Sequence, residues 1–97
     1  MIHVNPLKIE DKTALGVRVD LPESPPLLLV IGERGFVMCG FLNIDAADKL
    51  KVAAVMVSGV QSFDDVLKAE VRAVTSKASK IGIGLGMMGK DAIRLLL

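Results

Sequence analysis

The chain has 97 residues, with 12 basic and 11 acidic side chains, one His, one Cys and an apolar fraction of 52%. This length allows one hydrophobic core and predicts a single domain over residues 1–97. One Cys excludes an internal disulfide and one His excludes a multi-histidine metal site. We expect no metal and no other cofactor. A formal net charge of +1 gives no overall attraction to nucleic acid or to an acidic membrane.

The apolar fraction is high for so short a chain. A domain of this size buries only about 60–65% of the surface of its unfolded chain, so some apolar side chains stay exposed or are covered by another subunit. The longest uncharged run, Val52 to Phe63, has twelve residues, against roughly 20 needed to cross a bilayer. No basic segment followed by an apolar one begins the chain, so we expect a cytoplasmic location. The surplus of apolar side chains leads us to expect a homo-oligomer, and we expect no membrane partner.

The first 40 residues predict an antiparallel meander of four strands. Apolar and polar residues alternate from Leu15 to Leu21 and, more briefly, from Leu7 to Ile9, as in strands with one buried face. Pro6 lacks a backbone donor and favours an edge strand or a bulge. The apolar run Leu27–Ile31 and the segment Phe36–Cys39 complete the meander.

Two similar strand–glycine–helix units follow, 19 residues apart. Gly40 precedes Asn43, a helix cap, and Gly59 precedes Ser62, a second cap. Such units predict parallel strands joined by a right-handed crossover. The ordinary preferences of strand-to-helix turns are the favoured explanation of the likeness.

The last third is ambiguous at residues 70–74, which fit a short strand and also a helical stripe. We favour a strand to Val74, then a helix from Thr75 to Ile81 that Gly82 ends, and a last helix from about Met88 to Leu96. The predicted fold class is α+β: a four-stranded antiparallel meander followed by βα units, forming a mixed sheet with helices packed on one face.

Cys39 is the candidate for catalysis, because it ends a strand beside a helix start, where backbone amides activate thiols. A nucleophilic Cys needs a base, and His3 is in reach only if the first strand neighbours the fourth. The alternative is a small core residue, since free Cys is often buried.

Four acids lie at the two helix starts: Asp45, Asp48, Asp64 and Asp65. Gathered at one sheet edge they would suit Mg²⁺. Favourable contact with the helix dipoles explains them without a metal.

The segment Gly84–Lys90 matches part of two phosphate-binding patterns, with Gly84, Gly86 and Gly89 spaced as G-x-G-x-x-G. Asp91 stands where a phosphate loop has Ser or Thr. The alternative is a tight loop between two helices. The C-terminal third is basic but has no aromatic residue for base stacking, so we do not expect nucleic acid binding.

Several segments together resemble the small archaeal and bacterial proteins grouped as domain of unknown function 1805, the YunC-like proteins. They are Gly35–Leu42, Val57–Val60, Phe63–Leu67 and the pattern from Gly82 to Ile93. The resemblance implies a stand-alone α/β domain and no established activity or catalytic residue.

The residues predict, first, an oligomeric, non-enzymatic ligand-binding or interaction module. The candidate ligand-binding residues are Gly40, Gly59, Asp64, Asp65 and Gly89. The alternatives are a Cys39-dependent enzyme or thiol sensor and a phosphate or nucleotide binder that uses Gly84–Lys90.

Overall fold

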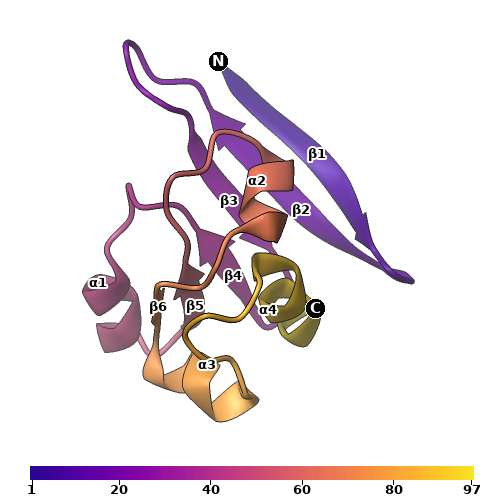
Figure 1. The fold of residues 1–97 in the computed structure, drawn as a ribbon, viewed down its shortest axis with the longest axis vertical. Coiled ribbons are helices and arrows are strands. Elements are labelled where there is room, and N and C mark those ends of the chain that lie inside the picture. Colours follow the sequence, from indigo (N-terminus) through magenta and orange to yellow (C-terminus); the bar gives the residue numbers. More distant parts are fainter.

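A computed structural model describes residues 1–97, and its centre is one six-stranded sheet whose strands lie in chain order (Figure 1). The strands are β1 (Ile2–Ile9), β2 (Lys12–Val19), β3 (Leu27–Ile31), β4 (Gly35–Met38), β5 (Ala53–Met56) and β6 (Ala73–Val74). Only β4 and β5 are parallel, and every other pair is antiparallel. The predicted meander, the parallel pair and the α+β class are confirmed.

Four helices join and follow these strands: α1 (Ile44–Lys49), α2 (Phe63–Lys68), α3 (Ser76–Ile81) and α4 (Gly89–Leu96). The Asn43 side chain accepts hydrogen bonds from two amides of α1, and Ser62 accepts one from α2. Gly82 ends α3 at a φ of 113°, in the left-handed region that favours glycine. The expected caps therefore lie where the residue types indicate.

The helices cover both faces of the sheet, which corrects the expectation of one covered face. On the first face, Val37 and Val55 pack in a core of 17 buried residues with Ile93 of α4. On the second face, Met38 and Ala54 pack with Ala47 of α1. The central strands β4 and β5 are apolar on both sides, so each side needs a cover.

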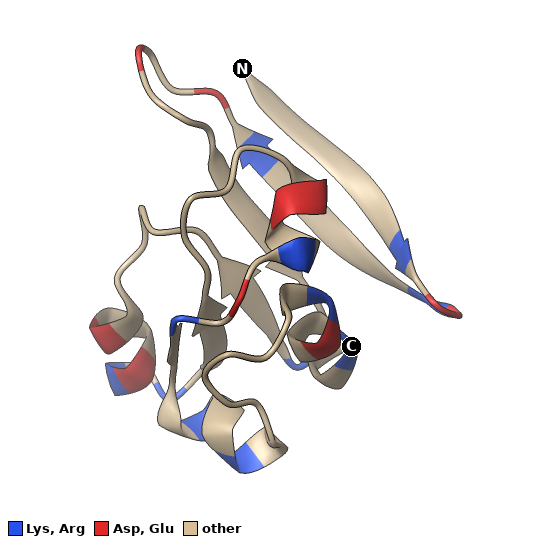
Figure 2. Cartoon of the chain, viewed as in Figure 1, with Lys and Arg blue, Asp and Glu red and all other residues tan.

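The strand β1 is an edge strand that pairs only with β2, in an unbroken register without a bulge. Of the two alternatives for Pro6, an edge strand or a bulge, the structure has the edge strand. Charged residues lie mainly on helices, turns and strand ends, and β3 has none (Figure 2).

Thr75 is the one buried polar residue of the chain. Its hydroxyl donates to the carbonyl of Val52 at 2.7 Å and accepts from the amides of Ala54, at 3.0 Å, and Ala78, at 3.3 Å. One side chain thus caps α3 and fastens it to the start of β5. Residues 73–74 form the strand β6, and Glu70 makes only an isolated bridge to Met88.

Candidate functional site

A cavity of about 260 Å³ opens at the carboxyl ends of the parallel strands β4 and β5. Ligands of α/β proteins commonly bind at this edge of a sheet. The loop before β3 closes one side, because β3 runs antiparallel to β4 and begins where β4 ends. The cavity is lined by Pro25, Pro26, Cys39, Gly40, Phe41, Gly59, Val60 and Gln61.

The two glycines of the 19-residue offset both line this cavity, because parallel pairing brings the segments after β4 and β5 together. A Cβ atom added at Gly40 or Gly59 would meet no atom within 4 Å. Gly59 has a φ of 71°, which disfavours other residues, whereas Gly40 has no such restriction. Both glycines leave open space beside the cavity.

Several backbone donors at this edge have no partner within the protein. No hydrogen bond of the chain uses the N–H of Gly40, Phe41, Gly59 or Val60. By contrast, the N–H of Gln61 donates to Asp65 at 3.0 Å. The free amides are polar contacts available to a ligand or to water.

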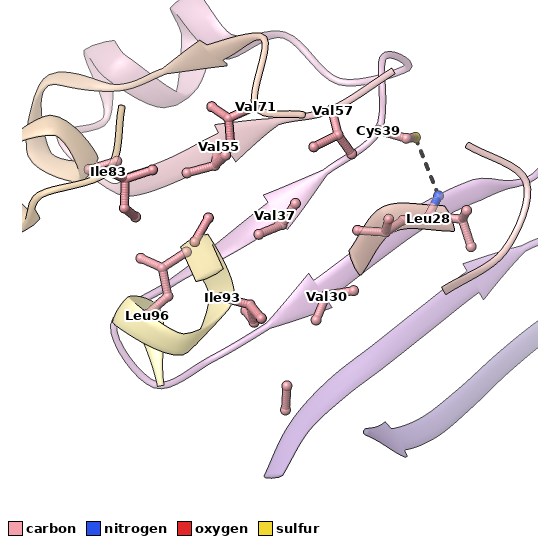
Figure 3. Packing of buried hydrophobic residues seen from close by; sticks show 14 of the residues in the cluster. Leu28, Val30, Val37, Cys39, Val55, Val57, Val71, Ile83, Ile93 and Leu96 are labelled. Atoms are coloured by element: carbon pink, nitrogen blue, oxygen red, sulfur yellow. Dashed lines mark hydrogen bonds between the residues drawn. The ribbon is translucent and has the colours of Figure 1, made fainter. Parts of the chain in front are cut away.

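Cys39 is buried, with 3% of its surface exposed, and its Sγ points to the backbone of β3 (Figure 3). The sulfur accepts a hydrogen bond from the N–H of Leu28 at 3.3 Å, and the Cys39 N–H donates to the Leu28 carbonyl at 3.1 Å. Cys39 thus extends the pairing of β3 and β4 by one residue and forms part of the cavity wall.

No histidine base accompanies Cys39. His3 lies on β1, and β2 and β3 separate that strand from β4. The Nε2 atom of His3 lies 3.1 Å from an oxygen of Asp20, whose other oxygen accepts from Arg18 at 2.9 Å. The Arg18 hydrogen bond, opposed by desolvation and aided by His3, lowers the pKa of Asp20. The condition for a Cys–His pair is therefore not met.

The four acids do not gather, because α1 and α2 lie on opposite faces of the sheet. Asp48 accepts from the N–H of Ser76 at 2.7 Å, and Asp64 lies 3.4 Å from Lys68. Asp64 and Asp65 do not line the cavity, and the chain contains no cluster of three potential metal-ligating side chains. Each acid with an observed partner makes a structural contact: Asp48 joins α1 to the start of α3, and Asp64 pairs with Lys68 within α2.

Gly89 lies away from the cavity, at the contact between α4 and α2. A Cβ atom there would collide with the carbonyl oxygen of Val66. The preceding loop follows a helix rather than a strand, and the N–H groups of Gly86 and Gly89 donate to Val71 and Ala69. The glycine spacing therefore serves close packing, and these two amides are not free for phosphate.

Residues 38–96 match the family model described as "Domain of unknown function (DUF1805)". The chain belongs to this family. It is 32% identical over 97 residues to the uncharacterised protein YunC of Bacillus subtilis (strain 168), covering 96% of this chain and 95% of YunC. The resemblance read from the residue motifs is thus confirmed.

A solved structure supports the fold. The protein of unknown function TA1206 from Thermoplasma acidophilum is similar with a TM-score of 0.94 and 34% identity, over 100% of this chain and 94% of that one. Membership in DUF1805 brings no assigned activity. None of the helices in this chain has both the length and the apolar character needed to span a membrane.

The sequence patterns do not predict two features of the site. These are the position of Pro25 and Pro26 in the cavity wall and the free amides of Phe41 and Val60. The prolines come from a loop more than ten residues before Cys39, and only the pairing of β3 with β4 brings them to the cavity. No local signal in the sequence marks them.

Proposed function

We propose that this protein is a non-enzymatic module that binds a small ligand in the cavity at the ends of β4 and β5. The cavity carries the proposal, since three candidate residues, Cys39, Gly40 and Gly59, converge on it. Its volume of about 260 Å³ lies just below the usual range of about 300–1,000 Å³ for ligand pockets. The ligand is therefore small.

The lining combines apolar walls with a few polar groups, as small-molecule sites do. Pro26, Phe41 and Val60 supply apolar surface, and the free amides of Gly40 and Gly59 supply donors. We infer a ligand with an apolar body and at least one acceptor oxygen. The buried free Cys is consistent with a reducing compartment, so we infer a cytoplasmic location.

Fragment screening by amide chemical-shift mapping tests the proposal. The probe is a library of neutral carbonyl and amide fragments of about ten non-hydrogen atoms, a size at which the best ligands still bind measurably. We expect amide shifts confined to residues 39–41 and 59–61 and to Ser24 and Leu27, which flank the two prolines, because proline itself has no N–H. Gly40→Leu places a side chain beside the cavity without a backbone collision and should weaken binding at least about tenfold.

Gly84→Leu is the matched control, because a Cβ at Gly84 also meets no atom within 4 Å and Gly84 does not line the cavity. It should bind as the unmodified protein does. Absence of localised shifts for every fragment, or equal binding by Gly40→Leu, would contradict the proposal.

The alternative of a Cys39-dependent enzyme or thiol sensor has one supporting observation, the place of the thiol in the cavity wall. Its burial and the distant position of His3 favour a structural thiol instead. Iodoacetamide separates the two functions. The binding module predicts that Cys39 reacts quickly only after denaturation, whereas rapid modification of the native protein at neutral pH would favour the thiol function.

A further inference from the structure

Half of one sheet face has no helix over it. On the face that carries α1, that helix packs against β5, and the small core beneath it extends to Leu29 of β3 but not to β1 or β2. The strand register turns alternate residues of these three strands to this side. We call this surface the open face; it includes Ile2, Val4, Leu15 and Val17, with the half-buried Leu29 and Ile31 at its border towards β4. Ile2 is 67% exposed, Val4 55% and Leu15 42%.

The open face is almost free of charge. Lys8 is the only charged residue whose position in the register turns it to this side, and it lies beside Thr13 at the hairpin end. Three strands about 4.8 Å apart, with about six residues of 3.3 Å each, cover an area of roughly 300 Å². The largest apolar patch of a typical soluble monomer covers about 300–600 Å² and is often functional, so this surface is a candidate interaction site.

Association through the free edge of β1 is disfavoured. The N–H of Asp20 donates to the carbonyl of Met1, so the odd-numbered residues of β1 bond to β2 and the even-numbered ones face outward. Pro6 is one of the outward residues and has no N–H to offer. A second strand added there would lose a central hydrogen bond, so the face and not the edge is available.

We propose that the open face packs against the same face of a second copy, in a two-fold dimer whose two sheets are about 10 Å apart. A two-fold axis brings identical residues near one another, so a charged centre would place like charges together at a cost of several kcal/mol. The centre here is aliphatic, at Val17 and its neighbours. Two such faces bury roughly 600 Å² of flat area, which is below the roughly 1,200 Å² of a standard specific interface, so the proposed dimer is a weak one.

A partner of different sequence is usually selected by complementary charges. The open face offers none except Lys8 at its end. A second copy needs no such selection, because aliphatic side chains meet aliphatic side chains in every register of the two faces. The chemistry of the surface thus favours self-association.

A charge placed on the open face tests the dimer. Leu15→Lys puts an ammonium group from each chain into the apolar interface, and Leu85→Lys makes the same change on a loop residue that is 70% exposed elsewhere. By light scattering at about 100 µM, well above a micromolar dissociation constant, the unmodified protein and Leu85→Lys should have twice the mass of one chain. Leu15→Lys should have the mass of one chain and keep the circular dichroism of the folded protein.

Amide hydrogen exchange distinguishes the face from the edge. In the proposed dimer the outward amides of Ile2 and Val4 stay without partners and exchange faster than those of His3 and Asn5. Slow exchange at Ile2 and Val4 would indicate pairing through the edge. A monomeric unmodified protein, or a dimer that persists in both Leu15→Lys and Val4→Lys, would also overturn the proposal.

Discussion

Cys39 shows how one side chain belongs to both the core and the candidate site. Its sulfur fills the end of the core and accepts the N–H of Leu28, which has no other acceptor and is fully buried. Leaving such a donor unpaired costs about 1–3 kcal/mol. The residue therefore has a structural reason to be present that is independent of any chemistry at the thiol.

We expect Cys39→Ala to lower the free energy of unfolding by about 1–3 kcal/mol, because the Leu28 amide loses its acceptor. Cys39→Ser keeps an acceptor atom at this position and should lose less. Urea unfolding followed by circular dichroism measures both. If the two variants were equally stable, the hydrogen bond to sulfur would contribute nothing.

At the scale of elements, the two strand–glycine–helix units differ in what their helices cover. The cap residues Asn43 and Ser62 start α1 and α2 as their side chains predict. No local pattern states that the two helices lie on opposite faces. That outcome separates the acids of α1 from those of α2, which is why the sequence-based Mg²⁺ hypothesis finds no cluster in the structure.

The contact between α2 and α4 depends on Gly89. We expect Gly89→Ala to destabilise the protein by about 1–3 kcal/mol, because the added Cβ overlaps the Val66 carbonyl and moves α4. This result would be opposite in sign to the usual effect of Ala for Gly inside a helix.

Gly84→Ala, where the added Cβ meets no atom within 4 Å, is the control and should change stability little. Thermal unfolding of the three proteins makes the comparison. Unchanged stability of Gly89→Ala would show that Gly89 is not required for packing, and Gly89 would again be a candidate ligand-binding residue.

In the whole molecule, the apolar residues lie mainly in two places, the buried cores and the open face. Twenty buried apolar residues form the cores on the two faces of the sheet, and alternate residues of β1, β2 and β3 form the open face. The exposed Ile2 and Val4 are regular strand residues, turned to the part of the α1 face that no helix covers.

A dimer through this face makes thermal stability depend on concentration, because the folded state then contains two chains and the unfolded state one. Raising the concentration from about 1 to about 100 µM should raise the Tm of the unmodified protein by a few degrees. The Tm of Leu15→Lys should not change. Differential scanning fluorimetry at several concentrations measures this, and equal slopes for both proteins would contradict the dimer.

Local patterns in the chain were enough to predict the strands of the meander, the parallel pair, the helix caps and the Gly82 stop. These features depend on residues close in sequence: the alternation of apolar side chains, the oxygen of a cap and the freedom of a glycine. The same patterns also identify Cys39, Gly40 and Gly59, because turns after strands need small residues.

The tertiary structure decided which of these features meet. Long-range pairing brings Pro25 and Pro26 to the cavity, holds His3 two strands away from β4 and turns Gly89 into a packing residue. It also leaves one half of a sheet face uncovered. Each of these outcomes depends on the order of the strands and on the sheet face that each helix covers. Burial of apolar surface over the whole chain sets both, so no pattern among residues close in sequence predicts them.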